Sequence, residues 1–123
     1  METKELAKRL VQLCQEGKNQ EAYDTLYADD VVSVEAGAPP GQSPETRGLA
    51  GAKGKGEWWA ANHEVHSAET SGPWPHDDRF AVRHRYDVTF KPTGNRMVMD
   101  EIAVYTVKGG KIVKEEFYYD GGM

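Results

Sequence analysis

His84 is the residue whose type and setting first suggest chemistry. It lies in the run Arg79–Phe90, where apolar side chains alternate with polar ones. Alternate residues of a strand share one face, so His84 falls in an otherwise apolar row. A histidine in such a row can act as an acid or base near neutral pH, or it can be a hydrogen-bonded core residue. The sequence leaves both interpretations open.

The segment His63–His66 carries two histidines and a glutamate without the spacing of a metal site. The zinc metalloprotease motif places its histidines four apart on a helix, and here they are three apart across a predicted helix-to-strand transition. His76, Asp77 and Asp78 belong to a predicted turn. We therefore predict no metal and no cofactor.

Four glycines, Gly48, Gly51, Gly54 and Gly56, resemble a phosphate-binding loop only superficially. A dinucleotide fingerprint needs a preceding strand in a βαβ unit, and a P-loop needs Gly-Lys-Ser/Thr after a fixed gap. Neither context is present, so we predict no nucleotide site.

The elements that must position these residues change in type along the chain. Helical spacing covers about residues 3–16 and 20–27, with Thr3 and Asn19 as predicted caps and Gly17 just past the first helix. A strand is predicted at 31–36, a loop at 37–48, a third helix at 49–63 and a strand at 65–71. The segment GPWPHDD then turns the chain.

The last third of the chain reads as an antiparallel meander. Strands at 79–90, 96–107 and 111–120 are separated by the turn sequences KPTGN and KGG. Helices followed by a meander predict an α+β fold, in which three N-terminal helices pack on a strongly curved, mostly antiparallel sheet. We expect one domain over residues 1–123.

Two of these strands have apolar residues on both faces. In the first, Val98, Ile102 and Val104 make the better core row and Met99, Glu101, Ala103 and Tyr105 make the other, and the sequence does not settle which row faces inward. In the last strand, Val113, Glu115, Phe117 and Tyr119 alternate with Ile112, Lys114, Glu116 and Tyr118, and the pattern does not decide between them. A sheet that is apolar on both faces predicts a homodimer.

Composition excludes several classes of partner. The net charge of −5 and the pI near 5.3 argue against nucleic acid and anionic membranes. We find no apolar stretch typical of a signal peptide or a membrane span. The single cysteine, Cys14, lies on the apolar stripe of the first helix. Together these features predict a cytoplasmic protein.

The order of elements, with ADDVVSVE at residues 28–35, the Trp58–Trp59 pair and the ending GGKIVKEEFYYD, resembles the nuclear transport factor 2-like superfamily. It looks closest to the SnoaL-like, polyketide cyclase-like branch, and the resemblance covers nearly the whole chain. It implies a conical fold with an interior pocket and a dimer across the outer sheet face. This superfold hosts isomerases, dehydratases, hydrolases and non-catalytic binders.

Two member families can be compared residue by residue. In ketosteroid isomerases the general base follows ADD and four further residues, a position held here by Glu35. Their two oxyanion donors would fall at Leu10 and Ala103, which cannot donate a hydrogen bond. Limonene epoxide hydrolases carry Arg-x-Asp before a PTG turn; the run Arg85–Asp87 lies one residue closer to that turn. Their second acid would fall at Phe117.

Two hypotheses of function follow. The first is a small-molecule enzyme of the isomerase, cyclase or dehydratase type, acting without a cofactor on an apolar or cyclic ligand. The second is a non-catalytic, dimeric ligand-binding or scaffold module. The candidate catalytic residues are Glu35 and His84, and the candidate ligand-binding residues are Trp59, His63, Tyr86, Glu101, Phe117 and Tyr119.

Overall fold

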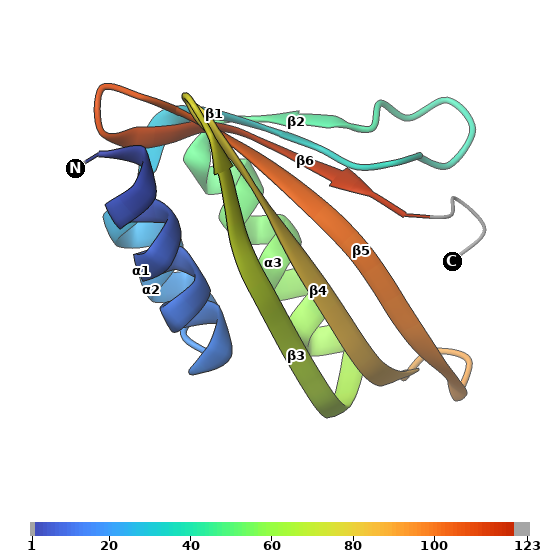
Figure 1. Cartoon of the computed structure of the whole chain (residues 1–123). Helices are drawn as coiled ribbons and strands as arrows, with labels where there is room; N and C mark the ends of the chain where they lie inside the picture. The colour runs from blue at the N-terminus through green and yellow to red at the C-terminus, as the bar shows by residue number, and fades with distance from the viewer. Residues whose placement is uncertain (1, 120–123) are drawn as a thin grey trace.

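The strands of this chain form one curved, six-stranded sheet with the helices on one side of it (Figure 1). The computed structural model describes residues 2–119. Strand order is β2-β1-β6-β5-β4-β3; β1 and β6 are parallel, and the other neighbouring strands are antiparallel. The predicted α+β fold, with three N-terminal helices on a mostly antiparallel sheet, is confirmed.

The elements lie close to their predicted positions. The helices are α1 (Thr3–Gln15), α2 (Asn19–Leu26) and α3 (Leu49–Asn62). The strands are β1 (Tyr27–Val34), β2 (Glu45–Arg47), β3 (His63–His76), β4 (Arg79–Phe90), β5 (Asn95–Lys108) and β6 (Lys111–Tyr118). The predicted loop at 37–48 thus contains a short strand, β2, which pairs with β1. Residue 120 of the last predicted strand lies outside the described residues.

The helix ends correct one prediction and explain another. Thr3 and Asn19 are the first residues of their helices, so the predicted side-chain caps are wrong. Glu2 and Lys18 hold the cap positions, and neither makes a side-chain cap hydrogen bond. Gly17 has a φ of 73° just after α1, the left-handed conformation that glycine adopts without a steric penalty.

β3 is longer than predicted because the segment around Gly72 is a bulge and not a turn. The ladder with β4 is interrupted between Ser71 and Trp74 and then continues to His76. The chain reverses at Asp77, whose φ is 55°. Glycine and proline interrupt strand pairing both at a β-bulge and at a turn, so the sequence pattern did not distinguish between the two.

The inward face of β5 differs from the favoured interpretation. The Val98–Ile102–Val104 row faces outward, with Val98 and Ile102 exposed, so the structure decides the question that the sequence left open. The register explains this result, because Ala103 pairs with Val82 and Tyr105 pairs with Phe80. All four of these residues are buried, and directly paired residues share one face of a sheet.

A bulge in β6 determines which of its residues point inward. Thr106 pairs with Lys114 while Val107 pairs with Ile112, which leaves one extra residue on β6. Ile112 and Glu115 are three positions apart, yet both are buried. A regular strand would place them on opposite faces. The bulge therefore brings the Glu115 carboxyl into the core.

The core fills the space between the helices and the sheet. Its fully buried members include Leu6, Leu10, Leu13, Val31, Phe80, Val82, Ala103 and Ile112.

Within the described part of the chain, no helix has the length and apolar character needed to cross a membrane.

Candidate functional site

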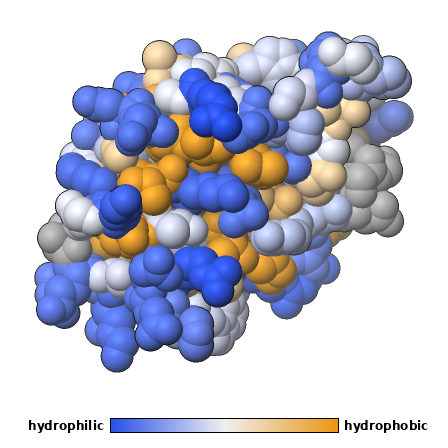
Figure 2. Space-filling view, turned by 90° about the horizontal axis from the view of Figure 1, so that it is seen from above, coloured by the Kyte–Doolittle hydropathy of each residue, from blue (hydrophilic) through white to orange (hydrophobic). Residues whose placement is uncertain are grey.

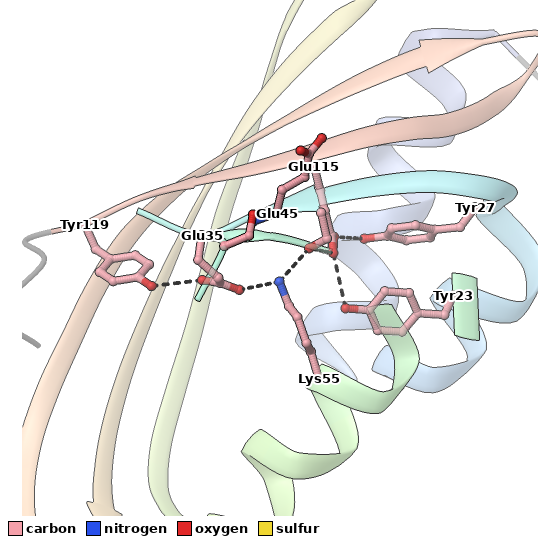
Figure 3. Close-up of polar contacts among 9 residues, drawn as sticks. Tyr23, Tyr27, Glu35, Glu45, Lys55, Glu115 and Tyr119 are labelled. Carbon is pink, nitrogen blue, oxygen red and sulfur yellow. Dashed lines mark hydrogen bonds and ion pairs between the residues drawn. The ribbon is translucent and has the colours of Figure 1, made fainter. Parts of the chain in front are cut away.

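Glu35 follows directly after β1 and points to the inner side of the sheet. Its Oε1 lies 2.7 Å from the ammonium of Lys55, and its Oε2 accepts a hydrogen bond of 2.9 Å from the Tyr119 hydroxyl (Figure 3). Its backbone N–H donates to the Pro44 carbonyl at 2.9 Å, which fixes the start of the side chain. One carboxyl oxygen thus faces a charged donor, and the other accepts from a hydroxyl group.

Lys55 reaches the site from α3, and the glycines of that helix explain its position. A Cβ on Gly51 would lie 2.8 Å from Thr46, and one on Gly56 would lie 3.4 Å from the Tyr23 ring. Glycine at these positions lets α3 approach β2 and α2 closely. From there the Lys55 ammonium donates to the Ser33 hydroxyl at 2.9 Å as well as to Glu35.

Glu115 is a carboxyl group inside the core, 1% exposed. Its Oε2 accepts a 2.6 Å hydrogen bond from Tyr27, and its Oε1 accepts from Ser33 at 2.9 Å and from Tyr23 at 3.4 Å (Figure 3). Burial raises its pKa, while the bonds from Tyr27 and Ser33 lower it, and the net direction is upward. Hydroxyls of α2 and β1 therefore compensate much of the cost of burying this group.

Glu101 differs from both of these carboxyl groups in having no partner among the residues that the structure describes. It is half-buried on the inner face of β5, and no hydrogen bond or ion pair within residues 2–119 holds its carboxyl. Burial, together with the nearby charges of Glu35 and Glu115, raises its pKa to about 7, and Lys55 opposes the shift. Glu101 can therefore change its protonation state near neutral pH.

His84 pairs with Glu101 across the β4–β5 ladder but is occupied on both sides. Hydrogen bonds join its Nδ1 to the Thr70 hydroxyl at 3.2 Å and its Nε2 to the Tyr105 hydroxyl at 3.1 Å. Burial lowers its pKa to about 4, so the ring is neutral at pH 7. This geometry favours the core-histidine interpretation, and an acid role for His84 stays a prediction.

Aromatic rings of the candidate ligand-binding residues contact one another and Lys55. Trp59 stacks on the His63 ring at 4.4 Å between centroids and lies 5.2 Å from the Tyr86 ring. The His63 Nδ1 bonds the Trp59 carbonyl at 2.8 Å. Phe117 lies under the Lys55 ammonium, 5.9 Å from ring centroid to Nζ. The candidate ligand-binding residues predicted from sequence thus fall into two groups, one around Trp59 and one around Lys55.

The Arg85–Asp87 segment contributes only in part. Tyr86 faces inward, whereas Asp87 makes a paired contact with Arg96 at 3.0 Å on the outer face. Arg83 and Asp100 form a similar pair on that face, with contacts of 2.9 and 2.6 Å. The one-residue offset from the epoxide hydrolase pattern therefore turns Asp87 away from the site.

Comparison with known proteins identifies the domain. A model of the SnoaL-like domain matches residues 1–119. The chain belongs to the SnoaL-like family. This SnoaL-like domain is similar to a Mesorhizobium loti protein of known crystal structure, described as a candidate SnoaL-like polyketide cyclase. The two are 43% identical, with a TM-score of 0.91, over 97% of this chain and 100% of that one.

More distant structures share the fold of this SnoaL-like domain. A candidate isomerase from Bacillus subtilis is 17% identical, with a TM-score of 0.75, over 96% of this chain and 86% of that one. A ketosteroid isomerase-like protein from Catenulispora acidiphila, solved in complex with trimethylamine, is 20% identical. Its TM-score is 0.72, over 97% of this chain and 88% of that one. No curated protein matches the chain at a significant level.

Sequence reasoning missed several polar residues of the SnoaL-like domain's site, above all Lys55 and Glu115. Lys55 lies in a helix with several glycines, where a lysine is expected to be exposed to solvent, and no sequence motif identifies it as a site residue. Glu115 was assigned to one of two undecided faces, because a β-bulge has no reliable sequence signature. Within the described residues, no three histidine, cysteine or acidic side chains are arranged to hold a metal ion.

A recess of about 370 Å³ lies apart from this cluster, between the end of α1 and β3. Its lining includes Cys14, Gln15 and Thr70. Burial raises the pKa of the Cys14 thiol to about 12, so this thiol is protonated and unreactive at neutral pH. The recess also has Glu69, an exposed carboxyl residue, in its lining.

Proposed function

We propose that this SnoaL-like domain binds a small, apolar or cyclic ligand on the inner face of its sheet and transfers a proton within it. The reaction class is that of a cofactor-independent isomerase, cyclase or dehydratase. Glu35 is the base and Glu101 is the acid. The supporting observation is that two carboxyl groups on one face have different surroundings. Glu35 is paired with Lys55, whereas Glu101 has no hydrogen-bond or ion-pair partner within residues 2–119.

Acid–base catalysis at a single pH requires one group that can accept a proton and a second group that can donate one. Glu35 accepts from Lys55 and Tyr119 and stays ready to take a proton from carbon beside a carbonyl. Glu101, with its pKa raised to about 7, is protonated in a large fraction of molecules and can donate to the carbonyl oxygen. It compensates for Leu10 and Ala103, which cannot donate at the positions where ketosteroid isomerases hold their donors.

Proton exchange on a simple cyclic ketone tests this proposal without knowledge of the natural substrate. We would follow the loss of the α-proton NMR signal of 2-tetralone in D₂O at pH 7, with and without the protein. We expect the wild type to accelerate exchange. Glu35→Gln should lose that acceleration by about 10²-fold or more, the usual contribution of a positioned base. Glu101→Gln should lose part of it.

The control for this experiment is Glu64→Gln, since Glu64 is exposed on β3 and faces neither carboxyl group. It should exchange the ketone at the wild-type rate. Exchange at the background rate with the wild-type protein would contradict proton transfer on this class of ligand. Equal rates for wild type and Glu35→Gln would remove Glu35 from the mechanism.

The alternative is a non-catalytic module that binds a ligand without changing it. The burial of Leu10 and Ala103 favours it, because these apolar side chains leave the ketosteroid isomerase donor positions without any donor. Calorimetric binding of 2-tetralone with no exchange above background would support this alternative. In either case we propose a homodimer formed through the outer face of the sheet.

A further inference from the structure

Glu115 is a buried acidic residue that the proposed reaction does not use. It lies in the core with three hydroxyl donors around it. Burying a carboxylate is costly, and replacing buried ionic groups by apolar ones is often neutral or stabilising. Stability alone is therefore a weak reason for a carboxylate at this position, and its contacts point to a role in positioning.

Ser33 connects Glu115 to the proposed site in one direction. The serine hydroxyl has a single proton, and Glu115 accepts it at 2.9 Å. Its oxygen is then free to accept from the Lys55 ammonium at 2.9 Å, and the same ammonium lies 2.7 Å from Glu35. The contacts thus run from β6 through β1 to α3 and on to the proposed base (Figure 3).

We propose that Glu115 and Ser33 are positioning residues that hold the Lys55 ammonium against Glu35. The inference rests on the proposed function, in which Glu35 is the base. Without Glu115 as acceptor, the Ser33 hydroxyl proton could point toward Lys55, where it would block the hydrogen bond from the Lys55 ammonium. By taking that proton, Glu115 fixes Ser33 as an acceptor, and Lys55 is fixed between two acceptors instead of one.

Titratable groups near Lys55 come from several elements, among them Tyr23 of α2, which contacts Glu115. Glu35 follows β1, Glu101 lies on β5, Glu115 lies on β6, and Tyr119 follows β6 and donates to Glu35. Lys55 is the cation among three carboxyl groups. Its position therefore affects the two carboxyl groups that face the ligand, and Glu101 can report that position.

Selective acetylation measures how firmly Lys55 is held. Lys53 is a matched internal standard, because its side chain is 31% exposed against 28% for Lys55 and it lies on the same helix. We would treat the protein with the N-hydroxysuccinimide ester of acetic acid at pH 7 and quantify both sites by mass spectrometry. In Ser33→Ala, the Lys55/Lys53 rate ratio should rise about tenfold, as the loss of one charge-assisted hydrogen bond implies.

Three further variants separate the positioning of Lys55 from a general loosening of the structure. Glu115→Gln should raise the Lys55/Lys53 ratio in the same way, because the acceptor that orients Ser33 loses its charge. Tyr23→Phe removes the weakest donor to Glu115, at 3.4 Å, and should leave the ratio unchanged. Ser33→Thr keeps the hydroxyl and should restore the wild-type ratio. Urea unfolding would establish that each variant is folded, and Glu115→Gln carries the test if Ser33→Ala is not.

Glu101 supplies a second readout that a purely structural role of Ser33 would not move. Lys55 lowers the pKa of Glu101, and Ser33→Ala changes no charge. If Lys55 moves away in that variant, carboxyl ¹³C NMR will give a higher pKa for Glu101 than in the wild type. An unchanged acetylation ratio with an unchanged Glu101 titration would overturn the proposal. Neither readout depends on catalysis, so a failure of ketone exchange would leave this test intact.

Discussion

At the scale of single residues, the site depends on what surrounds each carboxyl group. Glu35, Glu101 and Glu115 are the same residue type on neighbouring elements. Lys55 and Tyr119 contact the first, and three hydroxyls surround the last. For Glu101, burial and two negative neighbours outweigh the opposing charge of Lys55. The chemistry proposed for this domain follows from that difference and not from the presence of glutamate as such.

The pH dependence of stability tests the setting of Glu101. Its folded-state pKa of about 7 lies above the ordinary 4.5, so its stabilising contribution is fully present below 4.5 and is lost as pH rises to about 7. We expect Glu101→Gln to match the wild type at pH 4.5. At pH 8 it should be more stable by about 1–2 kcal/mol, after allowance for solvent screening.

Urea unfolding of both proteins at the two pH values measures this effect. The variant and the wild type must be compared at one pH, because His84 contributes the opposite slope. Its pKa of about 4 lies below the ordinary 6.5, and its stabilising contribution is lost as pH falls between these values. A stability gain in Glu101→Gln of the same size at both pH values would show that charge is not its cause.

Sequence pattern predicted part of this site and could not predict the rest. The alternation of apolar residues along 79–90 identified His84 and Tyr86 on the inner face, and the SnoaL-like resemblance pointed to Glu35. Lys55 was missed because a lysine among glycines looks solvated until the contacts of its helix are known. Glu115 stayed undecided because one inserted residue reverses which side chains point inward.

At the scale of elements, α3 combines poor helix formers with close packing. Its glycines fall into two kinds: a Cβ on Gly51 would lie 2.8 Å from Thr46, whereas a Cβ on Gly54 would meet nothing within 4 Å. Glycine is therefore required by contact at the first position and not at the second. The prediction of this helix from sequence was correct despite the cost of its glycines, because tertiary packing supplies most helix stability.

The two glycines provide a matched pair of substitutions. Gly54→Ala should stabilise the domain by about 0.5–1 kcal/mol, since it removes unfolded-state entropy and adds no contact. Gly51→Ala should be neutral or destabilising, because the new methyl group displaces Thr46 and with it β2. Thermal unfolding followed by circular dichroism measures both. Equal stabilisation by the two variants would mean that α3 does not need glycine to approach β2.

Strand ends were harder to predict than strand existence for a physical reason. Glycine and proline at 72–73 interrupt the pairing of β3 without ending it, so the predicted end at residue 71 was too early. The position of β5 was correct, but the sequence did not decide its inward face. Val98, Ile102 and Val104 are more apolar than the row that is buried, and only pairing with β4 determines which row faces the core.

At the scale of the whole molecule, the outer face of the sheet keeps apolar residues in contact with solvent. Trp74 is 56% exposed, Val98 53% and Tyr118 54%. Apolar side chains lie among charged ones on the face seen in Figure 2. The Arg83–Asp100 and Arg96–Asp87 pairs place both signs of charge on the outer face. Mixed charge around apolar residues suits a second copy of the same face, related by a twofold axis.

Ile102 is the position at which to test the proposed dimer. It is 38% exposed on the outer face and pairs with Tyr118. A charge in the middle of a buried interface is costly, so we expect Ile102→Glu to shift the protein from dimer to monomer at micromolar concentration. Light scattering over a dilution series measures this shift. Val65→Glu is the matched control, since Val65 is 47% exposed and pairs with the inward-facing Val88. A wild type that is monomeric throughout the series would refute the dimer.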